Sequence, residues 1–115
     1  YTVKQRISDI TRMEQEYSIS EHEYCELARE AGETPAVIRK TRWCLPCGEH
    51  IAEIDIYDFW NSVAVVEVEL SDENEAFVLP SQLTILSEVT GERAYLNKTM
   101  AYEIQKNGYV KEPQI

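Results

Sequence analysis

Polar and apolar residues alternate along much of the chain, with the period of two that one-sided β-strands show. In the first such stretch, Thr2, Lys4 and Arg6 fall on one side and apolar residues fall on the other. The pattern recurs several times before residue 71, and Trp60 with Asn61 predicts a tight hairpin connection inside it. Together these stretches predict strands over residues 1–7, 10–19, 36–45, 51–59 and 62–70.

A helix is predicted between the second and third strands. Ser20 and Glu23 have the spacing of a capping box, in which each residue satisfies a backbone N–H near the other. Apolar residues then recur at helical spacing until Gly32, a residue that commonly ends helices.

Two more helices are predicted in the second half of the chain. Ser71 can cap a short acidic helix over 71–77, and a last helix over about 97–106 stops at Gly108. We expect one further strand between these helices and a frayed or linker-like tail over 110–115. This order of elements predicts an α+β fold with a mainly antiparallel sheet.

The polar sides of the strands are sorted by charge. Cations dominate the first and third strands, whereas four acids crowd the last two, namely Glu53, Asp55, Glu67 and Glu69. An antiparallel sheet can simply keep a charged face in water, and that alternative requires no function. However, like charges that face each other across a sheet cost stability unless a cation lies between them. The sorting therefore favours a shared site.

The acidic residues suit a divalent metal ion. Residues two apart on a strand point the same way about 6.5 to 7 Å apart, so Glu67 and Glu69 can converge on one site. Asp55 on the neighbouring strand adds a third oxygen donor. Hard ions such as Mg²⁺ prefer carboxylates. The E-x-E spacing is common by itself, and its value comes from the paired strand.

The basic residues can form a phosphate cradle if their strand faces meet in one concavity. Arginine binds phosphate oxygens as a fork, whereas lysine supplies a mobile point charge. Taken singly, each of these residues is more often a surface charge. The candidates are Lys4, Arg6, Arg12, Lys40 and Arg42.

Composition limits the choice of partner and compartment. The 115 residues carry 21 acids against 11 Lys and Arg, a net charge of -10, which argues against nucleic acid. Any phosphate ligand then needs a locally basic pocket or a bound cation. No apolar run is long enough to predict a membrane segment, and three cysteines favour a reducing, cytoplasmic compartment.

Two of these cysteines, Cys44 and Cys47, form a C-x-P-C sequence that is typical of thioredoxin-type redox pairs. A strand-like run follows them, where such a pair would need a helix. No second pair of cysteines or suitably spaced histidines completes a zinc site. We therefore treat the redox function as a minor alternative.

Several blocks of the sequence resemble the CYTH superfamily in order and spacing. This superfamily includes inorganic triphosphatases, thiamine triphosphatases and class IV adenylate cyclases, and the resemblance extends from Tyr1 to about Ala101. The blocks are specific in combination, although each is weak alone. They are T-V-K at 2–4, R-x-E-x-E-Y at 12–17, I-R-K-T-R-W at 38–43, E-I-D-I-Y at 53–57, V-E-V-E at 66–69, the segment 72–77, and V-T-G at 89–91 followed by Y-x-N at 95–97.

The resemblance implies an antiparallel β-barrel, a triphosphate tunnel with polar side chains in its lumen and helices packed outside. It implies that Lys4, Arg12, Lys40 and Arg42 contact phosphates. It also implies that Asp55, Glu67 and Glu69 bind Mg²⁺ or Mn²⁺. Arg6 and Lys98 are weaker candidates for the phosphate end.

One part of the family pattern is absent. The N-terminal E-x-E-x-K strand is not found, and Tyr1 already lies in an alternating stretch. We therefore expect residues 1–106 to be a CYTH-type domain that lacks its N-terminal strands, with 107–115 as a C-terminal tail. Such an incomplete barrel is expected to be inactive alone or to complete its wall as a homodimer.

The expected function is metal-dependent hydrolysis of inorganic triphosphate or an organic triphosphate. Two alternatives use the same tunnel. One is cyclisation of ATP, and the other is a non-catalytic module that binds polyphosphate or a nucleotide. The sequence identifies no general base, no nucleophilic relay and no glycine-rich phosphate loop.

Overall fold

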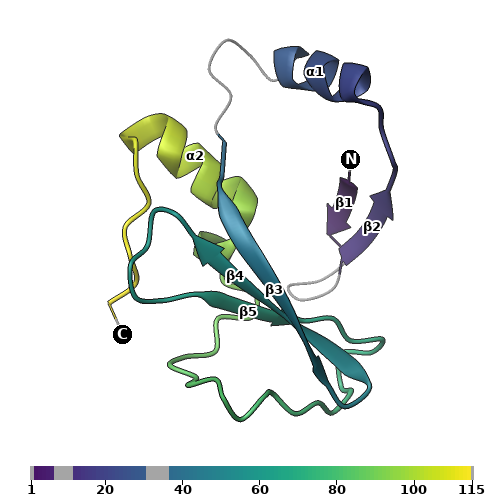
Figure 1. Cartoon of the computed structure of the whole chain (residues 1–115), viewed down its shortest axis with the longest axis vertical. Helices are drawn as coiled ribbons and strands as arrows, with labels where there is room; N and C mark the ends of the chain where they lie inside the picture. The colour runs from purple at the N-terminus through teal and green to yellow at the C-terminus, as the bar shows by residue number, and fades with distance from the viewer. Residues whose placement is uncertain (1, 7–11, 31–36, 115) are drawn as a thin grey trace. The chain divides into compact units, whose positions relative to one another are not determined.

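The computed structural model of the chain describes residues 2–6, 12–30 and 37–114, with side chains at 15–30 and 37–114 (Figure 1). The chain divides into two compact units, residues 1–36 and 37–115. Across the described ranges, no helix has the length and apolar character needed to cross a membrane.

The first unit contains a two-stranded antiparallel sheet. β1 (Thr2–Arg6) pairs with β2 (Arg12–Glu16), and the register places Lys4 opposite Glu14 and Arg6 opposite Arg12. The two strands predicted from alternation are thus present.

The helix α1 (Glu21–Glu30) follows β2 and begins as predicted. Ser20 Oγ accepts a hydrogen bond from the Glu23 N–H at 3.1 Å, and the Ser20 N–H donates to Glu23 Oε1 at 3.4 Å. This reciprocal arrangement is the capping box. The predicted end of the helix at Gly32 lies outside the described residues.

The second unit is built on a three-stranded antiparallel sheet in the order β3-β4-β5. The strands are β3 (Lys40–Cys47), β4 (His50–Tyr57) and β5 (Val65–Val68). Over the residues that the structure describes, this sheet does not close into a barrel. The fold is therefore mixed α and β with an antiparallel sheet, and the barrel remains an expectation.

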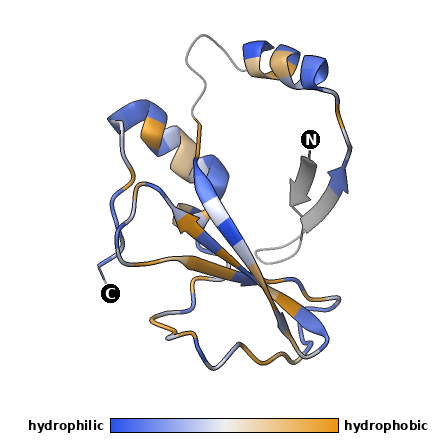
Figure 2. Cartoon of the chain, in the orientation of Figure 1, coloured by the Kyte–Doolittle hydropathy of each residue, from blue (hydrophilic) through white to orange (hydrophobic). Residues whose placement is uncertain are grey.

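The register divides the β3-β4-β5 sheet into two faces. Directly opposed residues share a face, and Arg42 lies opposite Asp55 while Glu53 lies opposite Glu67. One face, here called the polar face, carries Lys40, Arg42, Glu53, Asp55, Tyr57, Val65 and Glu67. The other, the apolar face, carries Thr41, Trp43, Leu45, Ala52, Ile54, Ile56, Val66 and Val68. The predicted faces of these strands are thus confirmed, and Figure 2 shows β3 passing from hydrophilic to hydrophobic positions along its length.

A hydrophobic core forms at one end of the polar face, where α2 (Asn97–Asn107) packs. A short 3₁₀ turn, η1 (Arg93–Tyr95), precedes this helix. Gly108 ends α2 with a φ of 81°, a left-handed conformation that glycine adopts without strain. The predicted helix end is therefore confirmed. The core consists of Tyr57, Trp60, Val65, Met100 and Val110.

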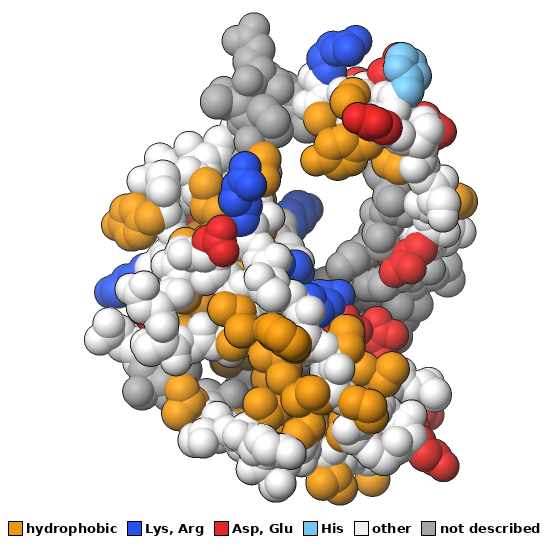
Figure 3. Space-filling view, viewed as in Figure 1, with side chains coloured by type: hydrophobic (Ala, Val, Ile, Leu, Met, Phe, Trp, Pro, Cys, Tyr) orange, Lys and Arg blue, Asp and Glu red, His pale blue; other side chains and the backbone are white. Residues whose placement is uncertain are grey.

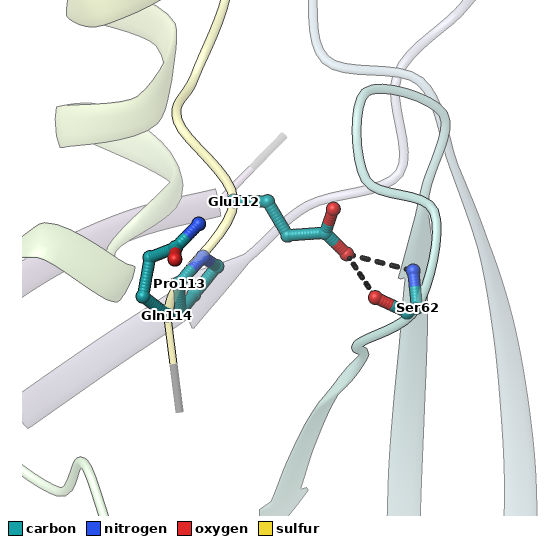
Figure 4. A pocket seen from close by; sticks show the side chains of 4 residues that line it. All are labelled: Ser62, Glu112, Pro113 and Gln114. Atoms are coloured by element: carbon teal, nitrogen blue, oxygen red, sulfur yellow. Dashed lines mark hydrogen bonds between the residues drawn. The ribbon is translucent and has the colours of Figure 1, made fainter.

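The C-terminal segment is docked, so the prediction of a frayed tail was wrong. Trp60 Nε1–H donates to the Val110 carbonyl oxygen at 3.2 Å. Glu112 Oε1 accepts hydrogen bonds from the Ser62 N–H at 2.7 Å, the Ser62 hydroxyl at 2.9 Å and the Asn61 N–H at 3.1 Å. Figure 4 shows Glu112 reaching Ser62 across a shallow pocket that Pro113 and Gln114 also line.

The predicted helix over 71–77 is not formed, and a turn takes its place, in which the Glu75 N–H donates to the Asp72 carbonyl oxygen at 3.0 Å. The Ser71 N–H donates to Glu75 Oε2 at 2.6 Å, and the Asn74 N–H donates to Asp72 Oδ1 at 2.8 Å. Such contacts compete with helix formation. Glu75 Oε1 also lies 2.8 Å from His50 Nε2, which joins this turn to the start of β4.

Two further connections differ from prediction. The link between β4 and β5 runs from residue 58 to 64, longer than a two-residue hairpin, and it turns where the Trp60 N–H donates to the Tyr57 carbonyl oxygen at 3.2 Å. The strand expected between residues 77 and 97 is absent from that fully described stretch. Turns and extended backbone occupy it instead.

Candidate functional site

Asp55 lies at the centre of the polar face and is 1% exposed. Arg42 binds it in a bidentate arrangement, with Nε 2.7 Å from Oδ1 and Nη2 2.9 Å from Oδ2. Lys40 Nζ donates to the same Oδ2 at 2.8 Å. Two adjacent positions of one face on β3 therefore place both cations on a single buried carboxylate.

These contacts set the charge of Asp55 and Arg42. Burial raises the pKa of Asp55, but the hydrogen bonds from Arg42 and Lys40 outweigh burial and hold that pKa below its ordinary value. The hydrogen bond to Asp55 in turn raises the pKa of Arg42, although burial acts against it. Asp55 is thus a carboxylate and Arg42 a guanidinium at neutral pH.

Arg42 also lies among the other acids of the polar face. Its Nη1 forms an ion pair with Glu53 Oε2, and the charge of Glu67 contributes to its raised pKa. Glu53 and Glu67 are directly opposed across β4 and β5. Arg42 therefore offsets the repulsion between acids that oppose each other across the sheet.

Tyr57 joins the ion pairs to the core, a role that the sequence did not reveal. Lys40 Nζ lies 5.7 Å from the centre of the Tyr57 ring, within the range of a cation–π contact. The Tyr57 hydroxyl donates to Asn97 Oδ1 of α2 at 2.8 Å. Burial raises the pKa of Tyr57 to about 12, so the hydroxyl stays protonated and keeps its donor. The only sequence signal was its position two residues after Asp55.

Comparison with known proteins identifies a related protein. The chain matches no protein-family model and no solved structure. An inorganic triphosphatase of Acetivibrio thermocellus is 35% identical over 107 residues, an alignment that covers 92% of this chain and 67% of that protein. The chain belongs to the inorganic triphosphatase family. The resemblance drawn from the sequence blocks is confirmed at this level, and the barrel and ligand assignments remain predictions.

In this triphosphatase-family chain, only some of the predicted site residues lie together on one face of the sheet. Lys40, Arg42, Asp55 and Glu67 share the polar face. Glu69 is exposed beyond the end of β5, and Lys98 is exposed in the first turn of α2.

The remaining predicted phosphate ligands belong to the first unit. Lys4 and Arg6 lie on β1 and Arg12 on β2, and their side chains are outside the described set. Their approach to a common cavity stays a prediction. Among the side chains that the structure describes, no group of three or more His, Cys, Asp or Glu is arranged to hold a metal ion.

The two cysteines of the C-x-P-C sequence do not face each other. Cys44 lies opposite Glu53 on the polar face and is exposed, whereas Cys47 lies on the other face at the end of β3. Both are free thiols. Residues three apart on a strand point to opposite faces, whereas on a helix they lie on the same side. Cys44 and Cys47 are therefore separated here.

Proposed function

We propose that this chain acts in a divalent-metal-dependent phosphohydrolase whose substrate is inorganic triphosphate or an organic triphosphate. The observation that carries the proposal is the single sheet face that holds Lys40 and Arg42 together with three carboxylates. The name of the relative, inorganic triphosphatase, supports a triphosphate substrate.

Lys40 and Arg42 are proposed to bind phosphate oxygens. The side chain of Arg42 is 40% exposed and that of Lys40 is 23% exposed, so an anion can reach both from solvent. The guanidinium offers parallel N–H groups and the ammonium a mobile charge. Fixed cations of this kind stabilise the charge that builds up on a transferring phosphoryl group. By the family resemblance, Lys4 and Arg12 add further phosphate contacts.

Asp55, Glu67 and Glu69 are proposed to hold Mg²⁺ or Mn²⁺. All three are carboxylates, the donors that such ions prefer, and Asp55 and Glu67 share the polar face, although no three of the described acids already surround one point. When bound, the cation would neutralise and orient the phosphates. The charge balance also supports a cation requirement. Two basic groups face the acids Glu53, Asp55 and Glu67, so the face described here is not positive enough by itself to attract a triphosphate.

Phosphate release is the direct measurement. The full-length protein would be incubated with tripolyphosphate, ATP or thiamine triphosphate, each with Mg²⁺, with Mn²⁺ or with EDTA. We expect release only with a metal, and about a 100-fold lower rate for Arg42→Ala. Arg39→Ala is the matched control, because Arg39 is an exposed arginine three residues away that precedes β3.

The other outcomes separate the alternatives. Cyclic AMP formed from ATP in place of free phosphate would favour a cyclase. Metal-dependent binding of a triphosphate without turnover would favour a binding module. If neither product nor binding is found with any substrate and metal, the proposal is wrong.

A further inference from the structure

We infer that Asp55 exchanges partners during ligand binding: it restrains Lys40 and Arg42 until a divalent cation takes their place, and this exchange releases both side chains toward phosphate. The inference rests on the proposed function and adds a coupling between the two ligands at that site. It also assigns Asp55 a role in phosphate affinity.

The contacts of Asp55 support such an exchange. Both of its oxygens accept charged hydrogen bonds, from Arg42 at 2.7 and 2.9 Å and from Lys40 at 2.8 Å. Its side chain is only 2% exposed, whereas those of the two cations are far more open. Asp55 is thus covered while Lys40 and Arg42 are open to solvent, and under the exchange a metal ion at its oxygens displaces at least one of these contacts.

The same contacts limit the affinity of the polar face for anions. Lys40 and Arg42 are each neutralised by Asp55, and Arg42 is shared with Glu53. A phosphate therefore competes with carboxylates that already occupy the N–H donors. When Asp55 no longer binds Lys40 and Arg42, their N–H donors are free, and the negative charge near the phosphate is smaller.

A simpler role for Asp55 predicts the opposite sign. If Asp55 only holds Lys40 and Arg42 in the geometry that phosphate needs, its removal disorders them and weakens phosphate binding. If the exchange operates, its removal strengthens phosphate binding in the absence of metal. The two roles are therefore separated by the direction of one change in affinity.

Calorimetry of inorganic tripolyphosphate binding in EDTA measures that direction. We expect Asp55→Asn to bind about five-fold more tightly than the wild type, because the amide keeps the shape and removes the charge. Asp58→Asn, which removes an exposed carboxylate beyond β4, is expected to stay within about two-fold. Weaker or equal binding by a folded Asp55→Asn variant would overturn the inference.

A second variant tests whether the bound cations hinder metal binding at Asp55. This test does not depend on whether Asp55→Asn folds. Lys40→Met removes one partner of Asp55, so we expect about five-fold tighter binding of Mn²⁺ without phosphate. Lys106→Met removes an exposed lysine at the far end of α2 and is the control. Unchanged Mn²⁺ affinity in Lys40→Met would overturn the exchange.

The wild type separates this inference from the proposed function. If the wild-type protein binds neither tripolyphosphate nor Mn²⁺, the proposed function fails and the exchange fails with it. If the wild type binds both and the variants change in the wrong direction, only the exchange is wrong.

Discussion

At the end of the β3-β4-β5 sheet that contacts the core, the two faces reverse the usual distribution of burial. An antiparallel sheet commonly buries its apolar face and leaves the polar one in water. Here Asp55 and Tyr57 of the polar face are 1% and 2% exposed, whereas Trp43 and Ile56 of the apolar face are 59% and 44% exposed. Figure 3 shows hydrophobic side chains at the surface over the unit that contains this sheet.

The position of the core explains the reversal. Met100 and Val110 pack with Tyr57 and Val65, both of which are on the polar face. The ion pairs of Asp55 therefore lie beside a hydrophobic core, where water is scarce and charge interactions are stronger. A charged face that merely contacts solvent would not be enclosed in this way, so burial of Asp55 argues for a site.

Truncation of the core should show the largest difference between the faces. Met100 is fully buried, and we expect Met100→Ala to lower the free energy of unfolding by about 3 kcal/mol. Trp43→Ala removes a larger but mainly exposed side chain from the apolar face and should cost less than about 1 kcal/mol. Urea unfolding of both variants measures this. Equal losses would show that the two faces are buried to a similar extent in solution.

Breaking the ion pairs should have the next largest effect. Arg42→Met leaves buried Asp55 with Lys40 as its remaining cation. Loss of a partner from a fully buried pair costs about 3 to 5 kcal/mol, and we expect about 2 kcal/mol here because Arg42 is partly exposed. Thr41→Val, an exposed neighbour on the apolar face, should change stability by less than about 0.5 kcal/mol. If both variants unfold at the same urea concentration, the ion pairs do not stabilise the polar face.

Acid should weaken the polar face through Asp55, and we expect this to be the smallest effect. The pKa of Asp55 is held below its ordinary value of 3.8 in the folded protein. A lowered pKa contributes stability that is complete above the unfolded value and is lost as pH falls through the folded value. Urea unfolding between pH 7 and pH 2 should therefore show this loss only below about pH 4.

The matched variant for the pH series is Asp55→Asn, which has no carboxylate to protonate at this position. Its stability should fall less steeply over the same acid range. Identical slopes for the wild type and this variant would assign the acid sensitivity to other carboxylates, such as Glu75 and Glu112. Hydrogen bonds from Ser71 and His50 lower the pKa of Glu75, and hydrogen bonds from Ser62 lower that of Glu112.

Local patterns predicted the parts of the fold that depend on neighbouring residues. The period-two alternation placed Lys40 with Arg42 and Glu53 with Asp55 on shared faces, as the register confirms. The capping box at Ser20 was likewise predicted from spacing alone.

Features that depend on distant partners were not predicted. The segment after Ser71 has the residues of a helix start, but it forms a turn, and the Glu75 carboxylate contacts His50 of β4. The tail has the composition of a linker, yet Trp60 binds the Val110 carbonyl across 50 positions.

The candidate site was predicted in part for the same reason. Spacing within a strand identified which charges share a face with Asp55. It did not reveal that Arg42 and Lys40 occupy both oxygens of Asp55, because that depends on how β3 and β4 pair. Spacing alone therefore could not show whether the Asp55 oxygens are free to bind a metal ion. That question required the strand register and the side-chain conformations together.

The contact between Glu112 and Ser62 has a consequence for biosynthesis. The chain leaves the ribosome from its N-terminus, so the connection between β4 and β5 emerges 50 residues before the carboxylate that fastens it. Contacts of such long sequence separation form slowly. The connection between β4 and β5 is thus expected to lack this contact until the residues around Glu112 have been translated.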